Sequence, residues 1–200
     1  MKRSMKNLPA EERRQVTIEV VVQLASERSP EQITTAAIAE KMKLTQGALF
    51  RHFPSKEALW EAVMKWVNET LMSAVDQAVA GESAVADLER MFMAHIGFVS
   101  RHPGVPRMLF AELQRPEDTP AKKVARALLQ RYGQRVTNLL EKGIGEGCID
   151  PGLDVQMASG MFIGLVQGLV MQSLLGGSQS SMQDEAPKVL GLYLKGIAKE

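Results

Sequence analysis

The sequence predicts an all-α protein of about nine helices. Only the run from Ile18 to Val22 is rich in the β-branched residues that favour strands, and its flanking pattern fits a helix better. Aromatic residues make up 5% of the 200 residues, which is few for a β-sandwich, whereas 45% apolar and 24% charged residues are ordinary for a globular chain. Elsewhere, apolar side chains recur at helical spacing in segments bounded by proline, glycine and hydroxyl caps.

Four helices are expected in the N-terminal part of the chain. Pro9 and two glutamates open the first helix, and Ser29-Pro30 ends it. Thr34 or Thr35 caps the second, Thr45 caps a very short third helix, and Ser55 begins a long fourth helix. The expected spans are 9–26, 36–42, 45–51 and 55–80.

Five more helices are expected towards the C-terminus. Gly81 marks the first boundary, and the segment from Pro103 to Pro106 interrupts the chain before a short helix. Glycines at 143, 145 and 147 are expected to end the helix that follows Thr119-Pro120. The expected spans are 83–100, 107–113, 120–142, 154–175 and 182–199.

Residues 155–183 carry no charge and are long enough to span a bilayer. Gln and Ser recur through this stretch, and Gly176-Gly177-Ser178 breaks it. A helix that is apolar nearly all round in a soluble protein is a buried one. The sequence therefore favours a buried interface helix over a membrane span, and no membrane partner is expected.

The charges are distributed unevenly along the chain. The formal net charge is only +1, which by itself argues against a nucleic-acid binder. Residues 1–65, however, hold 11 Lys and Arg against 8 Asp and Glu, whereas residues 66–200 hold 13 against 15. Because phosphate attraction acts over about one Debye length, the basic N-terminal segment is the relevant one.

A single cysteine, Cys148, excludes an internal disulfide framework and a multi-cysteine zinc site. We therefore expect a cytoplasmic protein with no metal and no cofactor. The basic N-terminus lacks the apolar segment of a signal peptide.

The most informative stretch is TTAAIAEKMKLTQGALFRHFPSK, residues 34–56. It contains a two-turn helix, a short break and a second short helix, with Leu44 filling the turn and small Ala39 permitting close approach. This is helix-turn-helix geometry, in which the second helix enters the major groove by its N-terminal residues. Thr45 to Ala48 are small or polar, as base-contacting positions require.

Residues 38–60, IAEKMKLTQGALFRHFPSKEALW, resemble the tetracycline-repressor (TetR) family of bacterial regulators. The resemblance implies a three-helix helix-turn-helix DNA-binding domain at 9–67, joined by a long helix to a helical ligand-binding and dimerisation bundle at 68–200. Lys43 stands where the family usually has Gly, so this residue either avoids the left-handed region or adopts it at some cost. Phe50 replaces the usual Tyr.

The resemblance also assigns roles in binding a double-stranded DNA operator. Thr34 and Thr35 would bind phosphate, Gln46 would bridge an adenine, and His52 and Lys56 would hold the backbone. A flexible basic arm at residues 2–6 would reach the neighbouring groove. The complete expected set of DNA-binding residues is Thr34, Thr35, Thr45, Gln46, Gly47, Ala48, Phe50, Arg51, His52 and Lys56.

By the same resemblance, the bundle responds to a small-molecule effector. Adaptable Met and Phe side chains would line a pocket for an apolar or amphipathic ligand, although for any single one of them an ordinary core position is the favoured interpretation. His95 has the competing interpretation of a hydrogen-bonded core histidine. The expected pocket residues are Met91, Phe92, His95, Phe98, Met108, Phe110, Tyr132 and Phe162.

A homodimer is expected to form through the charge-free helix and the last helix. Three glycines at a four-residue period let another helix approach closely, and a twofold dimer requires a palindromic operator. A helix buried within the monomer is the alternative. The expected interface residues are Gly160, Gly164, Gly168, Leu190, Leu194 and Ile197.

The function that these features predict is a ligand-responsive transcriptional regulator, a repressor that its effector releases from DNA. No enzyme is predicted, because Gly143 to Gly147 end a helix and so do not form a dinucleotide-binding loop, and Cys148 is a lone thiol. Two rivals remain: a helical carrier of lipid-like molecules that does not bind DNA, and a membrane-bound adaptor.

Overall fold

The computed structural model describes residues 9–176 and 179–199, and the expected basic arm at residues 2–6 lies outside them. Within this part, the all-α fold is confirmed: there are nine α-helices, one 3-10 turn and no strand beyond an isolated bridge between Ile149 and Ala198. The elements are α1 (Ala10–Glu27), η2 (Pro30–Gln32), α2 (Thr35–Lys41), α3 (Gln46–Phe50), α4 (Lys56–Ala78), α5 (Ala84–Arg101), α6 (Gly104–Gln114), α7 (Pro120–Gly145), α8 (Val155–Gly176) and α9 (Gln179–Ile197).

Three of the expected boundaries are wrong. Helix α6 begins at Gly104 and contains Pro106, because the first turn of a helix has N–H groups without intrahelical partners and so tolerates proline. Helix α7 continues through Gly143 to Gly145, and the chain turns at Gly147, whose φ of 76° lies in the left-handed region. Helix α9 begins at Gln179, three residues earlier than expected.

The chain forms two compact units, each discontinuous in sequence. The first runs up to Glu69 and includes His102–Ala127, and the second comprises Thr70–Arg101 and Leu128–Glu200. By its internal contacts, α6 therefore groups with the N-terminal helices. The expected domain boundary after residue 67 stays a prediction.

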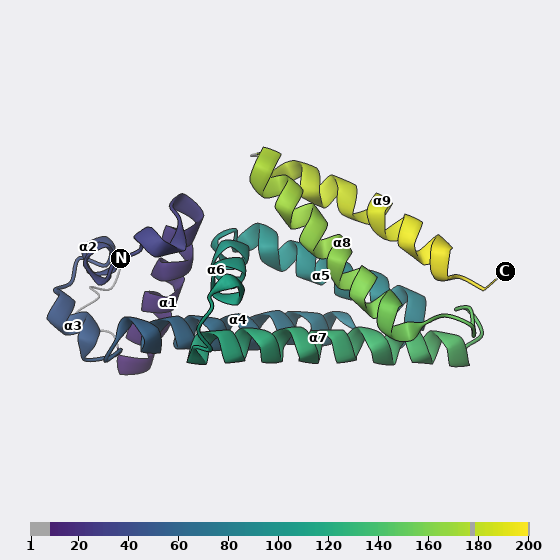
Figure 1. Cartoon of the computed structure of the whole chain (residues 1–200), viewed down its shortest axis with the longest axis horizontal. Helices are drawn as coiled ribbons and strands as arrows, with labels where there is room; N and C mark the ends of the chain where they lie inside the picture. The colour runs from purple at the N-terminus through teal and green to yellow at the C-terminus, as the bar shows by residue number, and fades with distance from the viewer. Residues whose placement is uncertain (1–8, 177–178, 200) are drawn as a thin grey trace. The chain divides into compact units, whose positions relative to one another are not determined.

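In the first unit, α1 packs on α6 (Figure 1), and at their point of contact only glycine fits. A Cβ atom built on Gly104 would lie 2.0 Å from the Val22 carbonyl oxygen and 2.9 Å from the Ser26 nitrogen. Val21, Val22 and Ala25 of α1 are 0, 4 and 0% exposed, so the helix face beside this contact is fully enclosed. Gly104 thus sets the distance between the two helices.

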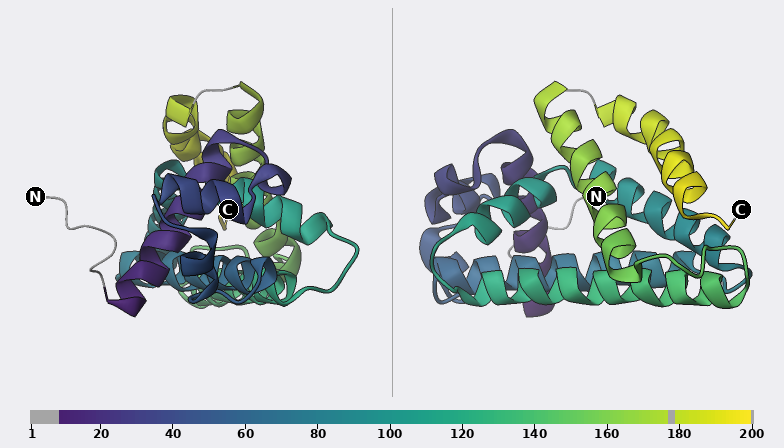
Figure 2. Two further views of the ribbon diagram at one scale, coloured as in Figure 1. Left: turned by 90° about the vertical axis from the view of Figure 1, so that its left-hand side faces the viewer. Right: turned by 45° about the vertical axis from the view of Figure 1, so that its right-hand side comes forward.

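In the second unit, α8 and α9 lie side by side and both contact α5 (Figures 1 and 2). Phe162 of α8 makes edge-to-face contacts with Phe92 of α5 and Tyr193 of α9, with ring centroids 5.3 and 5.7 Å apart. The Tyr193 hydroxyl donates to the Ala158 carbonyl oxygen at 2.9 Å. Burial of that hydroxyl raises the pKa of Tyr193 to about 12.

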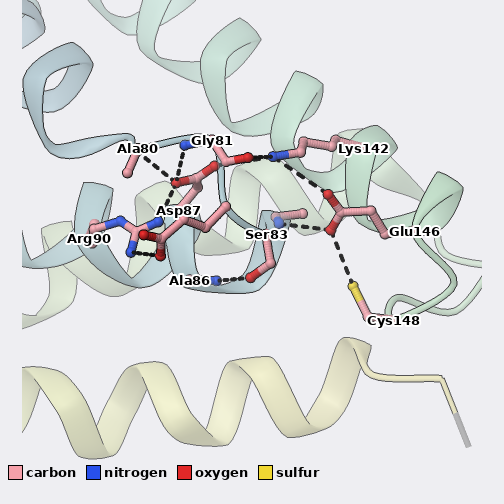
Figure 3. Close-up of polar contacts among 11 residues, drawn as sticks. Ala80, Gly81, Ser83, Ala86, Asp87, Arg90, Lys142, Glu146 and Cys148 are labelled. Atoms are coloured by element: carbon pink, nitrogen blue, oxygen red, sulfur yellow. Dashed lines mark hydrogen bonds and ion pairs between the residues drawn. The ribbon is translucent and has the colours of Figure 1, made fainter.

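Asp87, with no exposed surface, organises the loop between α4 and α5 (Figure 3). Its carboxylate accepts hydrogen bonds from the Ala80 and Gly81 amides at 3.0 and 3.1 Å and pairs with Arg90 at 2.7 Å and Lys142 at 3.3 Å. Burial alone would raise the pKa of Asp87, but these hydrogen bonds outweigh it and hold the pKa at about 2. The buried charge is therefore fully compensated.

Candidate DNA-binding surface and buried polar site

Hydroxyl side chains start the helices of the helix-turn-helix segment. The oxygens of Thr34, Thr45 and Ser55 each accept a hydrogen bond from the backbone N–H three residues on, at 3.1, 3.3 and 3.1 Å. Because each oxygen acts as an acceptor in its cap, the hydroxyl hydrogen stays available to an outside acceptor.

The turn between α2 and α3 is closed by two backbone hydrogen bonds. Lys43 N–H donates to the Glu40 carbonyl at 2.9 Å, and Leu44 N–H donates to the Ala39 carbonyl at 2.8 Å. Lys43 has a φ of 56° and is the one non-glycine residue with a positive φ in the described part of the chain. Of the two outcomes left open by the sequence, Lys43 therefore adopts the left-handed conformation, at a steric cost.

Helix α3 has a buried side and an exposed side. Ile38, Leu49 and Phe53 are 0, 2 and 2% exposed, so they anchor α2 and α3 in the core of the first unit. Most of the residues expected to contact DNA, from α3 and from the segments on either side of it, are exposed. Exposed are Thr34, Thr45, Gln46, Gly47, Phe50, Arg51 and Lys56, and half-buried are Thr35, Ala48 and His52.

Arg14 of α1, to which the sequence assigned no role, holds the end of α3 in place. Its guanidinium donates to the His52 carbonyl oxygen and lies 4.5 Å from the centroid of the Phe53 ring. The helical periodicity of α1 gives no sign of this contact, because the partner residues lie 38 positions along the chain.

A second candidate site lies among the rings of the second unit. His95 of α5 and Tyr132 of α7 contact each other, with ring centroids 5.0 Å apart. Within the described residues, neither His95 Nδ1 nor the Tyr132 hydroxyl has a hydrogen-bond partner, and both atoms are shielded from solvent. Burial lowers the pKa of His95 to about 4 and raises the pKa of Tyr132, so both groups are neutral at pH 7.

The structure gathers six of the eight expected pocket residues in this second unit and leaves two in the first. Phe92 contacts Phe162 and His95 contacts Tyr132, whereas α6, which carries Met108 and Phe110, belongs to the first unit. In the second unit are Met91, Phe92, His95, Phe98, Tyr132 and Phe162.

The expected interface residues of α8 and α9 differ in exposure. Gly160, Gly164 and Gly168 are exposed, and a Cβ atom added to any of them would meet nothing within 4 Å. Leu190 and Ile197 of α9, by contrast, are 3 and 6% exposed. These two side chains pack inside their own unit, where α9 contacts α5 and α8, and their place in a dimer interface stays a prediction.

The outward side of α8 carries an apolar stripe. Met157, Met161 and Leu175 are 65, 62 and 82% exposed, and Met171 is 43% exposed. Helix α8 is the one helix of the described residues that is long and apolar enough to cross a membrane, a test that core helices of soluble proteins also pass. No group of three His, Cys, Asp or Glu residues in the same part of the chain could hold a metal ion.

A capped short helix, a closed turn and a second helix with an exposed polar N-terminal end define a helix-turn-helix DNA-binding protein. Residues 18–63 match the family model described as bacterial regulatory proteins, tetR family. Residues 18–63 therefore form a DNA-binding domain of the TetR type. The family consists of regulators rather than enzymes.

Among curated proteins, the nucleoid occlusion factor SlmA of Marinomonas sp. (strain MWYL1) is 24% identical over 160 residues, which are 80% of this chain and 81% of that protein. SlmA of Alteromonas mediterranea is 32% identical over 124 residues, covering 60% of this chain and 64% of that protein.

Solved structures share the fold. The ketosteroid transcriptional regulator KstR2 of Mycobacterium tuberculosis aligns with a TM-score of 0.79 at 24% identity, over 94% of this chain and 96% of that one. The transcriptional regulator FadR from Bacillus subtilis, solved in complex with stearoyl-CoA, aligns with a TM-score of 0.79 at 20% identity, over 92% of this chain and 98% of that one.

Proposed function

We propose that this protein is a cytoplasmic, homodimeric repressor that binds a palindromic operator through α3 and leaves it when a small apolar or amphipathic effector binds the second unit. The observation that carries the proposal is the exposed polar end of α3, Thr45 to Ala48, on a helix-turn-helix of the TetR family. Repression by an effector-sensitive protein requires that the effector bind more tightly to the arrangement that does not fit DNA.

Base contacts are assigned to α3. Gln46 is exposed, and its amide matches the donor and acceptor of an adenine edge. Gly47 is exposed with nothing within 4 Å of an added Cβ atom, which leaves room for close approach to the groove. The free hydroxyl hydrogens of Thr34 and Thr45, together with Lys56, are assigned to phosphates.

The effector site is assigned to the ring cluster around His95 and Tyr132. A buried polar atom without a partner costs free energy, so a ligand that hydrogen-bonds it is favoured at that point. Both groups are neutral, which fits a carbonyl, hydroxyl or ester on an otherwise apolar molecule. FadR of similar fold was solved with stearoyl-CoA, an amphipathic ligand, which supports this class of effector.

The dimer contact is assigned to the outward face of α8. Met157, Met161, Gly164, Gly168, Met171 and Leu175 follow one another at alternating spacings of four and three residues, the spacing of a helix–helix seam. Covering this face by a second copy removes it from water and gives the charge-free helix a partner other than lipid.

DNA binding is tested by fluorescence anisotropy on the DNA upstream of the protein's own gene, at low and moderate salt. Gln46→Ala is expected to weaken binding to the operator in this DNA about tenfold, because a bidentate base contact contributes about 1–3 kcal/mol. The matched control is Gln32→Ala, an exposed glutamine of η2 with no assigned contact, which is expected to bind as the unaltered chain does. An equal loss of DNA affinity in both variants, or no specific binding to a palindrome in this DNA, would contradict the proposal.

Dimerisation is tested by analytical ultracentrifugation. Met161→Lys places a charge in the proposed seam and is expected to give monomers, whereas Met93→Lys, at an exposed methionine of α5, keeps the dimer. The effector class is tested by mass spectrometry of molecules that co-purify with the chain and are lost from a Tyr132→Phe variant.

The similarity to SlmA favours a second candidate function, nucleoid occlusion. In that case the protein binds DNA, but deleting its gene changes cell division rather than the transcription of neighbouring genes. Transcript profiling of a deletion strain, combined with imaging of dividing cells for loss of nucleoid occlusion, separates the two functions.

A further inference from the structure

The first unit contains a cavity with a volume of about 450 Å³, and of its lining residues only Lys56 has a part in the function proposed above. Its walls come from four places in the chain: the 3-10 turn η2, the first turns of α4, the end of α6 and the start of α7. All of these belong to the same compact unit. The volume lies in the range of pockets that hold small organic molecules.

Two cations line this cavity without close anionic partners. Lys56 forms no ion pair with any described residue, and Arg115 makes only long pairs, at 3.8 Å to Glu112 and 3.7 Å to Glu117. Burial and the nearby charge of Arg115 both lower the pKa of Lys56. The two cations therefore repel each other across a space that an anion would neutralise.

The nearby carboxylates engage these cations only in part: Glu112 and Glu117 stay 3.8 and 3.7 Å from Arg115, and no described carboxylate lies within 4.0 Å of the Lys56 ammonium. Glu112 is only 2% exposed, and its carboxylate accepts a hydrogen bond from the Thr119 hydroxyl. Glu31 and Glu57 also line the cavity, but both are exposed and neither lies within 4.0 Å of a Lys or Arg nitrogen of the described chain. Arg115 is 46% exposed and keeps donors for an incoming oxyanion.

The remaining wall is largely apolar. Trp60 is 7% exposed, and its ring centroid lies 4.9 Å from the Lys56 ammonium. Pro30 and Pro120, with Ala111 and Ala121, complete this wall. A site with an aromatic face beside paired cations favours an anion that carries a flat apolar body over a bare inorganic ion.

We propose that this cavity binds a small organic carboxylate, with its carboxyl group on Arg115 and Lys56 and an aromatic or short apolar body against Trp60. Such a ligand is distinct from the effector assigned to the second unit, because none of the cavity residues belongs to that unit.

The site is also placed to affect DNA binding. Lys56 begins α4, six residues after the end of α3, and is assigned to a phosphate. An anion in the cavity attracts the Lys56 side chain and so weakens DNA binding, and by linkage DNA weakens anion binding by the same factor. This coupling rests on the proposed DNA contact of Lys56, whereas occupancy of the cavity does not.

The test is isothermal titration calorimetry of the full chain with sodium benzoate, with benzamide as the neutral ligand of the same shape. We expect benzoate to bind at millimolar concentrations and benzamide to bind at least tenfold more weakly. In a Trp66→Phe variant, Trp60 is the only remaining tryptophan, so its fluorescence reports occupancy directly. Arg115→Gln is expected to weaken benzoate binding about tenfold, while Arg107→Gln, at an exposed arginine of α6 outside the cavity, leaves it unchanged.

Absence of benzoate binding, equal binding of benzoate and benzamide, or an unchanged affinity in Arg115→Gln would overturn the site. Inorganic phosphate that binds as tightly as benzoate would contradict the part assigned to Trp60. Repeating the operator anisotropy with benzoate present tests the coupling separately: an unchanged DNA affinity, with benzoate bound, overturns the coupling alone.

Discussion

Gly104→Ala is expected to be strongly destabilising, because it adds one methyl group where α1 and α6 touch. The new carbon would lie 2.0 Å from the Val22 carbonyl oxygen. Carbon and oxygen atoms in such contacts are separated by about 3.3 Å or more, so α6 has to move away from α1 by about 1.3 Å. The obstacle is backbone, which no side-chain rotation relieves.

The magnitude follows from that movement. Gaps of about 0.5–1 Å already forfeit a quarter to a half of the dispersion attraction between facing atoms, and overpacking costs about 1–3 kcal/mol. With backbone on both sides of the clash, we expect a loss of about 3 kcal/mol. For a chain of this size, the melting temperature falls by about 2–4 °C per kcal/mol, so a decrease of about 6–12 °C is expected.

The assay is urea and thermal unfolding followed by tryptophan fluorescence, because Trp60 and Trp66 both lie in the first unit. The matched control is Gly47→Ala in α3, where an added Cβ atom meets nothing within 4 Å. Alanine is the better helix former by about 0.5–1 kcal/mol, so this variant is expected to be more stable. If Gly104→Ala unfolds at the same urea concentration as the unaltered chain, α1 and α6 do not approach each other as closely at Gly104 as described here.

Three further outcomes are expected. Lys43→Gly relieves a left-handed residue and should stabilise the first unit by about 0.5 kcal/mol in urea unfolding, and a loss of stability would refute the strain at that position. Asp87→Asn should cost about 3 kcal/mol by leaving Arg90 and Lys142 without their buried partner. Because the pKa of Asp87 is held at about 2, below its ordinary value of 3.8, its contribution is present above pH 3.8 and lost as the pH falls towards 2. Acid titration of both forms, monitored by circular dichroism, should show this step only in the unaltered chain. Tyr132→Phe should stabilise the effector-free protein by about 1 kcal/mol, because it removes a buried hydroxyl without a partner, and a lower melting temperature would show that the hydroxyl is satisfied.

Much of the DNA-binding segment was predictable because its signals are local. A threonine followed by a short apolar-periodic stretch caps a helix through a bond to a backbone group three residues on, and this holds at Thr34 and Thr45. The backbone conformation of Lys43 was predictable only in part. The sequence identified the position but not which of two conformations the lysine adopts.

The partners of the helix faces were not predictable in the same way. Leu190 and Ile197 of α9 have the spacing of an apolar stripe, but that spacing is the same whether the stripe faces the chain's own core or a second copy. For Arg14, the sequence shows a charged residue on a helix, whereas its contact with Phe53 requires α1 to be packed beside the segment between α3 and α4.

The sequence by itself determined the helices, their caps, the helix-turn-helix and the basic charge of the segment that contains it, because each depends on residues within a few positions of one another. Only the tertiary structure decided that α6 packs on α1 through Gly104, that His95 and Tyr132 bury polar atoms together, and that Lys56, Trp60 and Arg115 enclose a cavity. These arrangements join residues from distant helices. They depend on how side chains of different helices pack against one another, and helical periodicity within one helix does not predict which helices meet.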